Sequence, residues 1–586
     1  MPDLVEGFVS LIGGMDGRTA PEILPENRYA RGLNVSSRSG LIHTRPGFPF
    51  FPAALPANPN DKFQGAALYR LNGVDRIICV IKGIVYGINL NTLAITTYKD
   101  TLDATVDRCH FCQADKFMIV QDGVNKAVII NYSDDPDDCE RAGANEVPVG
   151  TIMAYGHGRL FVVVLELGGV DVGQRFFVAG DIIKPNDVSD VLQFTETTYL
   201  AGGGAFALPN ELGYITAMKF LRNAPTGTGF GSLIVMAKNG ASAFAVNQPR
   251  TDWQDTDLSQ VLFTGSGSLS PFSVIPVNND LFFRGRVGLR TIGYTLAASG
   301  GSSATHAVVP LSEPADEFFE GDTDAEQAFV SMAHVNSRVF CTAKPHTVSG
   351  EVRFQGLVSI DAAVISSFGQ NTEPIFDGIW TGYDFLHVLR GVYDSVERLF
   401  AFVRSETGSL FLCYLDEYAE EDADSTRLQC RTYTRVFSFL SDGRNSYALA
   451  DKRLRYVDLW IRDLEGQADI KVYYRPIGYE LWNQLGSTVT VQAAAGSLSQ
   501  RRDRIRFNAA KGTFDPITKR DVMIGNAFQF CIEWTGKLTL QKMSALVQPV
   551  EESETIACKA DDTAQTLSAG AGGVVLSDYE YDALGG

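Results

Sequence analysis

The chain has 586 residues, of which 45% are hydrophobic and 20% charged, so it can fill a core and is not a disordered segment. Its 50 basic and 69 acidic residues give a net charge of −19, which argues against a protein that binds nucleic acid through phosphate contacts. The 56 glycines and the 11% of aromatic residues favour many short strands joined by tight turns.

The signals for cellular compartment are mostly negative. No apolar run reaches 18 residues, so we expect no membrane insertion by this chain. The N-terminus lacks the basic and apolar regions of a secretory signal. The nine cysteines are spread from Cys79 to Cys558, unlike the dense pattern of a small disulfide scaffold. We therefore expect a soluble protein made in a reducing cytosol.

Residues 1–60 are rich in Pro, Gly and Asn and predict an extended N-terminal arm. Between residues 61 and 445, short apolar runs recur, such as 66–71, 76–81 and 84–88, and turn dipeptides separate them. Groups of such runs begin near residues 65, 108, 151, 214, 271, 328 and 384. Four-stranded propeller blades repeat at about 40–50 residues, with loops lengthening some of them. The region predicts a β-propeller of six or seven blades, some irregular; stacked β-sandwiches are the alternative.

The C-terminal part predicts a further β domain and a tail. Six strand-like runs follow one another over residues 446–550, at 454–461, 469–475, 487–492, 503–507, 528–534 and 537–548. This spacing is typical of a small β-sandwich. Residues 551–586 form an acidic, Gly/Ala-rich C-terminal tail. The predicted fold class is therefore all-β, with a propeller and an additional small sandwich.

Motifs for catalysis or for metal and cofactor binding are weak. Cys109 and Cys112 form one C-x-x-C, but no second pair completes a zinc site, and a separation of three places them on opposite faces of a strand. The seven histidines, from His43 to His387, form no H-E-x-x-H or H-x-H motif, and no G-x-S-x-G or phosphate-binding glycine loop occurs. We expect no catalysis, no metal and no cofactor.

Three acidic clusters lie between strand groups, within residues 134–138, 316–326 and 416–424. Such loops can supply the six to eight oxygens that calcium takes, but none has a recognised calcium-binding spacing. Two carboxylates also serve in glycosidases, and with 69 acids a suitable pair arises by chance. We expect mainly solvated loops, with calcium binding and a glycosidase site as the alternatives.

The N-terminal arm carries the most specific pattern. It contains a Gly-Gly pair, a proline some residues later, an asparagine, a Gly-Leu pair and an Arg-Pro pair: Gly13, Gly14, Pro21, Asn34, Gly40, Leu41, Arg45 and Pro46. This order of residues resembles the opening of tail nozzle (tail tubular) β-propeller proteins of short-tailed bacteriophages. The likeness covers about 40 residues strictly and extends loosely to the propeller texture and to the late sandwich.

The resemblance implies a structural virion protein rather than an enzyme. It implies a ring homo-oligomer, a hexamer, that lines the DNA exit channel and docks to an adaptor on the portal, with tail fibre or spike proteins as further partners. The expected location is the tail of the virion, after synthesis in the cytoplasm of the host bacterium. An acidic channel wall repels phosphate, so DNA is expected to pass without specific binding.

Physical reasoning about the arm agrees with such a role. Arg45 precedes Pro46 and is therefore held extended. An extended arm can pair into the last blade of a propeller and remove a free sheet edge, or it can lie on a neighbouring subunit. An ordinary loop-rich leader is the alternative. The competing function classes are a carbohydrate-binding or glycan-cleaving β-propeller and a non-viral scaffold propeller.

Overall fold

The computed structural model describes most of the chain between residues 3 and 550. The described ranges are 3–131, 134–184, 186–195, 205–221, 231–247, 250, 253, 258–277, 280–293, 310–344, 346–348, 351–353, 355–362, 374–419, 421–422, 427–439, 450–493, 503–509 and 521–550. His306, the predicted tail at 551–586 and parts of the third acidic cluster lie outside them. No helix in the described ranges is long and apolar enough to cross a membrane.

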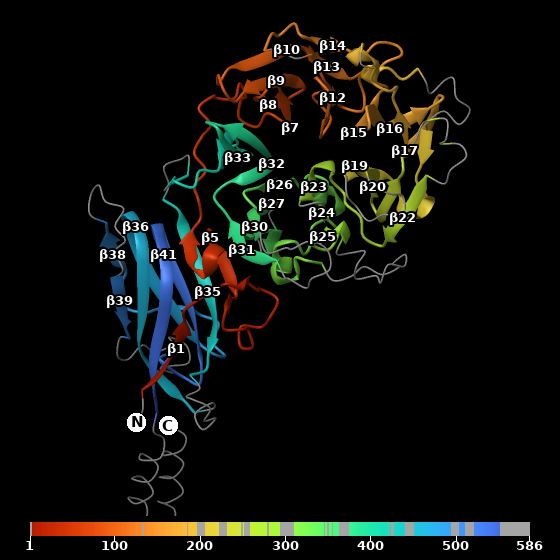
Figure 1. Ribbon diagram of the computed structural model, residues 1–586. Coiled ribbons are helices and arrows are strands. Elements are labelled where there is room, and N and C mark those ends of the chain that lie inside the picture. Colours follow the sequence, from red (N-terminus) through yellow and green to blue (C-terminus); the bar gives the residue numbers. More distant parts are fainter. Residues whose placement is uncertain are drawn as a thin grey trace, which may run out of the picture.

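The structure is an all-β protein that contains a β-propeller (Figure 1). In the described part of the chain, six separate antiparallel sheets form blades, each with its strands in chain order. Their strands are β7–β10 (Phe63–Leu71, Val74–Ile81, Ile84–Asn89, Ile95–Thr101), β11–β14 (His110–Ala114, Phe117–Gln121, Val128–Asn131, Cys139–Arg141), β15–β18 (Gly150–Gly156, Arg159–Leu167, Val170–Ala179, Ala205–Ala207), β19–β22 (Ile215–Leu221, Ser232–Ala237, Gly240–Phe244, Ser259–Thr264), β23–β25 (Val274–Val277, Asp280–Arg284, Leu289–Thr291) and β32–β34 (Asp384–Tyr393, Val396–Arg404, Leu410–Tyr414).

One end of a larger sheet completes the ring of blades. Strands β26 (Met332–Val335), β27 (Arg338–Ala343), β30 (Gly356–Asp361) and β31 (Ile375–Trp380) fill the sector between β25 and β32. The innermost strands β7, β11, β15, β19, β23, β26 and β32 contact one another in that order, and β32 returns to β7. The prediction of a propeller is confirmed, as six blades whose ring the large sheet closes.

Local sequence explains the regular blades. Asn72 and Gly73 have positive φ values of 50° and 75°, which suits the tight turn between β7 and β8. Middle strands are buried on both faces because blades pack on either side of them. Accordingly residues 77–81 and 117–120 are continuous runs of buried apolar side chains.

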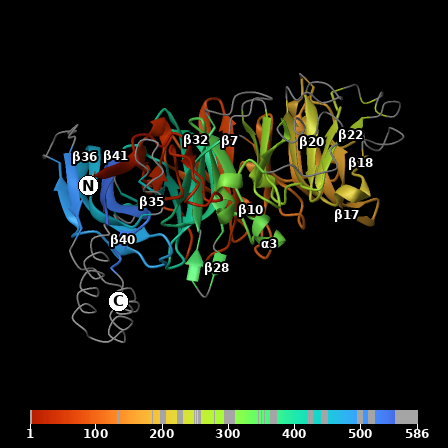
Figure 2. The ribbon, with the colours of Figure 1, turned by 90° about the horizontal axis from the view of Figure 1, so that it is seen from below.

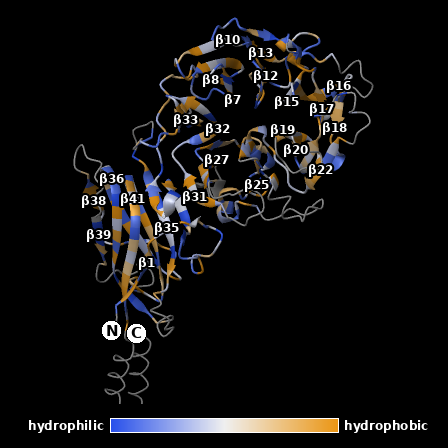
Figure 3. Ribbon diagram, viewed as in Figure 1, coloured by the Kyte–Doolittle hydropathy of each residue, from blue (hydrophilic) through white to orange (hydrophobic). Residues whose placement is uncertain are grey.

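The C-terminal region is a large curled mixed half-barrel at the side of the propeller (Figure 2). Its two long strands, β36 (Lys452–Pro476) and β41 (Phe528–Pro549), run antiparallel and carry alternating apolar and polar residues (Figure 3). The shorter strands are β35 (Gln429–Phe437), β37 (Asn483–Gln484), β38 (Val489–Gln492), β39 (Asp503–Asn508) and β40 (Ile524–Gly525).

This half-barrel differs from the small sandwich that the sequence predicts. The runs at 454–461 and 469–475 belong to the single strand β36, and its register against β41 shifts at four places. Asp463 and Gly466 have φ values of 51° and 62° at these irregularities. Such bulges bend a strand and increase its twist. One sheet therefore curls around its own apolar face, which includes Val457, Ile470 and Trp534.

The N-terminal arm belongs to the large sheet. Strand β1 (Leu4–Phe8) and strand β6 (Ile42–Thr44) pair with β41, and β5 (Val35–Ser36) pairs with β6. Strand β4 (Arg31–Leu33) lies between β31 and β35, parallel to the first and antiparallel to the second. The arm thus joins the propeller end of the sheet to the half-barrel.

The remaining elements are short. They are β2 (Gly14–Met15), β3 (Arg28–Tyr29), the hairpin β28 (His346–Val348) and β29 (Glu351–Arg353), the 3-10 helices Arg38–Gly40, Val188–Leu192, Asn210–Leu212, Pro271–Ser273 and Glu313–Phe318, and α3 (Asp324–Gln327).

Candidate functional site: the arm junction

The arm junction is the place where the arm meets β31, β34 and β35, and Asn34 lies at its centre. Asn34 is buried and has a φ of 55°, a conformation that asparagine tolerates better than most residues. Its side-chain oxygen accepts from Arg45 Nε at 2.9 Å and from the Thr381 amide at 2.7 Å. Its side-chain nitrogen donates to Thr381 Oγ1 at 3.0 Å and to the Gln429 carbonyl at 2.8 Å. Asn34 therefore ties the arm to both β31 and β35.

Arg45 is fully buried, and all five of its guanidinium donors have acceptors. Nη1 and Nη2 bind the Asp422 carboxylate at 3.0 and 2.7 Å. They also donate to the carbonyls of Pro46 at 2.8 Å and Thr381 at 2.9 Å, while Nε binds Asn34. A buried guanidinium needs this complete set, because each unmet donor or unpaired charge is costly.

A second buried network is centred on Asp377 of β31. The Asp377 carboxylate, on β31, accepts from the Ser37 amide at 2.8 Å, from Ser37 Oγ at 3.0 Å and from Ser359 Oγ at 2.8 Å. The Asp377 carbonyl accepts from the Tyr29 hydroxyl at 2.9 Å. Burial and the neighbouring Asp377 charge raise the pKa of Tyr29, so its hydroxyl remains a donor.

The structure places the eight residues of the arm pattern in three groups, and one of these groups forms the centre of the junction. Asn34, Arg45 and Pro46 share the network around Asp422. Gly13 and Gly14 lie beside β3 and the start of β31, and the Pro21 carbonyl accepts from the Val436 amide of β35 at 2.8 Å. Gly40 has a φ of 79° and accepts from the Leu11 amide, and the half-buried Leu41 leads into β6.

The end of the arm supplies an outer strand to the last blade. The Phe51 amide donates to the Leu412 carbonyl of β34 at 2.8 Å, and the Tyr414 amide donates to the Pro49 carbonyl at 3.2 Å. The buried rings of Phe48 and Phe51 pack edge-on against Phe385 and Phe400, with centroid distances of 5.2 and 5.8 Å. Of the two placements that the sequence leaves open for the arm, pairing into the last blade is the one found within the chain.

Sequence reasoning missed the partners of the arm. Asp377, Thr381 and Asp422 lie far along the chain, and Asp422 falls in a cluster expected to be mainly solvated. Gly32 was missed as well, although an added Cβ there would lie 2.6 Å from the Asp377 carbonyl oxygen. Two closely approaching backbones leave no local signal in either segment.

The acidic clusters are largely ion-paired in the described residues. The Arg76 guanidinium beside Asp134, at 2.7 Å, holds the pKa of that carboxyl below its usual range. Further pairs join Asp322 to Arg284, Asp324 to Arg286 and Lys238, Glu317 to Arg31, and Asp416 to Arg398. The expectation of solvated loops is wrong for Asp322, whose side chain is 2% exposed. Asp134 and Asp324 remain 38% and 39% exposed although they are paired.

Residues considered for metal or redox chemistry are dispersed. Cys109 and Cys112 pack into different apolar clusters on opposite faces of β11, as the spacing predicts. Burial, with Arg108 nearby, lowers the pKa of His110 and of His387 to about 3. Within the described residues, no group of three or more His, Cys, Asp or Glu side chains could hold a metal ion.

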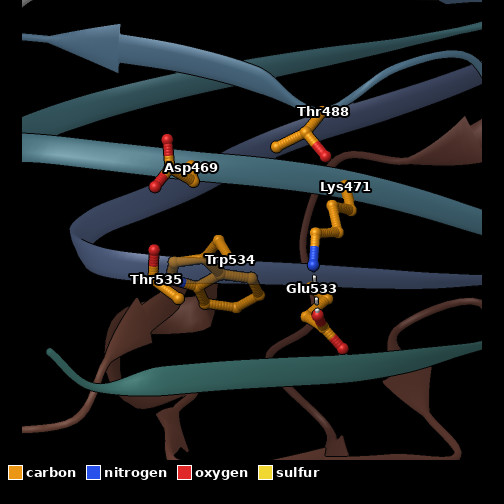
Figure 4. A pocket seen from close by; sticks show the side chains of 6 residues that line it. All are labelled: Asp469, Lys471, Thr488, Glu533, Trp534 and Thr535. Atoms are coloured by element: carbon orange, nitrogen blue, oxygen red, sulfur yellow. Dashed lines mark hydrogen bonds and ion pairs between the residues drawn. The ribbon is translucent and has the colours of Figure 1, made fainter.

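A pocket of about 310 Å³ opens on the half-barrel near the arm (Figure 4). Lys471 Nζ lies 3.4 Å from Glu533, which also accepts from Arg431 at 3.0 Å, and Asp469 accepts from Thr490 at 2.6 Å. The Trp534 ring is fully buried, and its Nε1 donates to Thr44 of the arm at 2.9 Å. Because the charges are compensated and the ring is covered, the pocket offers no stacking platform for a sugar.

Comparison with known proteins adds little. No protein-family model and no curated protein matches the sequence. Among solved structures, the computationally designed Ika8 protein is 10% identical, with 62% of this chain and 98% of that chain covered and a TM-score of 0.31. The extracellular domain of the putative one component system BT4673 from B. thetaiotaomicron is 12% identical, covering 83% of this chain and 64% of that chain, with a TM-score of 0.34. The chain thus spans just under two thirds of that second protein, and likenesses this weak carry no argument about function. From its own sheets, the chain is an all-β protein built around a β-propeller.

Proposed function

We propose that this protein is a structural subunit of a short phage tail, which forms a ring around the DNA exit path and docks to an adaptor on the portal. The resemblance of the arm suggests this role. The observation that carries the proposal is the arm junction, where Asn34, Arg45 and Asp422 fasten one segment to both the propeller and the half-barrel. A subunit of a tube that transmits DNA under pressure needs its parts held as one unit.

A basic and aromatic face on the half-barrel supports assembly with an acidic neighbour. Arg506 lies over the Tyr456 ring at 3.7 Å and also pairs with Asp458 at 2.9 Å. Lys542 lies over the Trp460 ring at 5.0 Å. Aromatic residues and arginine are enriched at protein interfaces. Since the chain as a whole carries −19, we assign this face to contact with another copy rather than to the channel wall.

The channel wall is expected to be lined mainly by Asp, Glu and uncharged polar residues. A basic wall would bind DNA through phosphate neutralisation and slow its passage. Screening beyond about 8 Å at physiological salt restricts the effect to charges close to the wall. Replacing acids of the wall by Lys is expected to slow DNA ejection while leaving assembly intact.

The test combines the mass of the purified protein with its position in particles. Sedimentation equilibrium is expected to give a ring oligomer, and electron microscopy of antibody-labelled particles is expected to place it in the tail below the portal. The variant Lys542→Glu is expected to weaken the ring while the fold, followed by circular dichroism, is retained. A monomer that is absent from particles contradicts the proposal, and specific binding or cleavage of glycans would favour a carbohydrate-active propeller.

A further inference from the structure

A pocket of about 270 Å³ lies at the axis of the propeller, on the side of blades β7–β10 to β19–β22. Its walls come from the inner strands β7, β11, β15 and β19, which surround the axis in Figure 1, and from β12. The volume lies near the lower end of the range for small-molecule pockets, about 300–1,000 Å³. The pocket therefore suits a ligand of few heavy atoms.

The lining is mostly apolar. It is formed by Ala67, Leu68, Phe111, Met118, Met153, Ala154, Met218 and Phe220. The polar residues are Cys112, Gln113, Tyr155 and Lys219. Gln113 is fully engaged, because its amide binds the backbone of Arg70 and of Asp115. The Cys112 thiol contacts the Gln113 carbonyl at 3.8 Å.

Lys219 and Tyr155 remain available to a ligand. Within the described residues, neither the Lys219 ammonium nor the Tyr155 hydroxyl has a hydrogen-bond or ion-pair partner. Both side chains lie close to Cys112, and Tyr155 also lies close to Asp115. Desolvation lowers the pKa of Lys219. Desolvation and the nearby Asp115 carboxylate raise the pKa of Tyr155, so its phenol stays neutral and can donate a hydrogen bond.

Arg108, another cation in the propeller interior, differs from Lys219 because it has hydrogen-bond acceptors. Arg108 donates to Ser270 Oγ at 2.7 Å and to the Ala328 carbonyl, and its guanidinium stacks on the rings of Phe272 and Phe329 at 4.8 and 5.0 Å. The protein thus supplies Arg108 with acceptors, whereas it leaves Lys219 facing a cavity. Lys219 is half-buried and has no such acceptor among the described residues, so a counter-anion in the cavity would stabilise its ammonium.

We propose that this axial pocket binds a small monocarboxylate, whose carboxylate accepts from Lys219 and Tyr155 and whose short apolar body packs on the three methionines and two phenylalanines. One cation and one hydroxyl match a single negative charge. The apolar lining favours a hydrocarbon body over an inorganic anion. This inference does not depend on the proposed tail function.

Isothermal titration with hexanoate tests the site, with hexanamide as the neutral analogue of the same size. One hexanoate is expected to bind per chain, and hexanamide at least about tenfold more weakly. Lys219→Met is expected to weaken hexanoate binding about tenfold or more and Tyr155→Phe by a smaller factor, whereas Lys116→Met, on the neighbouring β11–β12 turn, leaves it unchanged. Lys219→Met is also expected to raise the thermal midpoint without ligand, because it removes an unpaired cation.

Several results would overturn the proposal. They are undetectable hexanoate binding at about 10 mM ligand, equal binding of hexanamide, or unaltered affinity in Lys219→Met. Tighter binding of inorganic phosphate than of hexanoate at the same site also rejects a monocarboxylate. Should Lys219→Met fail to fold, the hexanamide comparison on the wild type and the Tyr155→Phe titration still decide the question.

Discussion

Arg45 and Asp422 are 377 positions apart in the chain, yet their side chains form a bidentate, fully buried ion pair with distances of 2.7 and 3.0 Å. The pair joins the arm to the segment between β34 and β35. Since Asp422 also accepts from the Phe48 amide at 3.1 Å, it fixes the point at which the arm turns from the large sheet to the last blade.

Asp422→Asn is expected to lower the free energy of unfolding by about 3–5 kcal/mol, because it leaves the Arg45 guanidinium buried without a countercharge. Urea denaturation followed by tryptophan fluorescence measures the loss. The matched control is Asp416→Asn, whose partner Arg398 lies at 3.5 Å in a more exposed place, and which is expected to cost about 1 kcal/mol or less. Equal losses of stability in the two variants would show that the burial of Arg45 does not set the cost. The double variant Arg45→Met with Asp422→Leu is expected to recover part of the stability that Asp422→Asn loses.

Gly14→Ala is expected to destabilise the protein more than Gly73→Ala. Both glycines have positive φ values, 70° and 75°, so both variants bear a backbone strain of about 1–2 kcal/mol. At Gly14 the new Cβ would also lie 2.7 Å from Ile375 Cγ2 and 2.8 Å from the Phe376 carbonyl oxygen, whereas at Gly73 nothing lies within 4 Å. Overpacking adds about 1–3 kcal/mol, so thermal melts of the two variants should differ clearly. Identical melting temperatures would contradict the close approach at Gly14.

Deleting residues 1–46 is expected to abolish folding or assembly. The deletion leaves the edges of β31 and β35 without β4, and it leaves the Asp377 and Asp422 carboxylates buried without their partners in residues 1–46. Residues 47–51 stay in place, with the Phe48 amide that donates to Asp422 and the pairing with β34. The variant therefore tests the part of the arm that joins the large sheet, including β1 and β6, which pair with β41. Size-exclusion chromatography and circular dichroism give the outcome, with the exposed-site variant Glu26→Ala as the control. A truncated protein that unfolds cooperatively and assembles as before would show that the arm is dispensable.

Stability is expected to fall as the pH drops below about 6.5, through the buried histidines. The pKa of His387 is about 3 in the folded protein, so the unfolded chain takes up a proton at a pH where the folded protein does not. The contribution of the neutral histidine to the free energy of unfolding is complete above the pKa of histidine in the unfolded chain. It declines as the pH falls towards the pKa in the folded protein, by about 1 kcal/mol between pH 6.5 and 5.5 for one histidine. His387→Leu is expected to reduce this pH dependence in urea titrations at the two pH values. The control is Phe272→Leu, which replaces the ring that packs on His387 at 4.8 Å but keeps the histidine. This variant is expected to retain the pH dependence.

The blades could be predicted from sequence because their signals are local. The innermost strands of all seven sectors begin within four residues of the predicted positions, since turn residues and short apolar runs mark each hairpin. The half-barrel could not be predicted in the same way. Leu454 and Tyr474 read as parts of separate strands, because only the pairing with β41 shows that bulges keep β36 continuous.

The arm pattern located the junction but not its chemistry. Asn34 and Arg45 stood out through their neighbours in sequence, whereas Asp377 and Asp422 have no local feature that distinguishes a buried carboxylate from a solvated one. Lys219 gave no signal either, because a lysine in an apolar strand shows its lack of partners only after the blades are assembled.

The position of β4 has a consequence for biosynthesis. Its two neighbours are β31 and β35, which emerge from the ribosome roughly 350–400 residues later, on the order of 20–80 s at about 5–20 residues per second. Over that interval β4 has no partner strand, and the β4 segment of another nascent chain would find the same acceptors in β31 and β35. The segment 52–62, with prolines at 52, 56 and 59, is the hinge at which such an exchange would cross between chains. Folding of one polypeptide and strand exchange between two therefore compete for a single three-residue gap in the sheet.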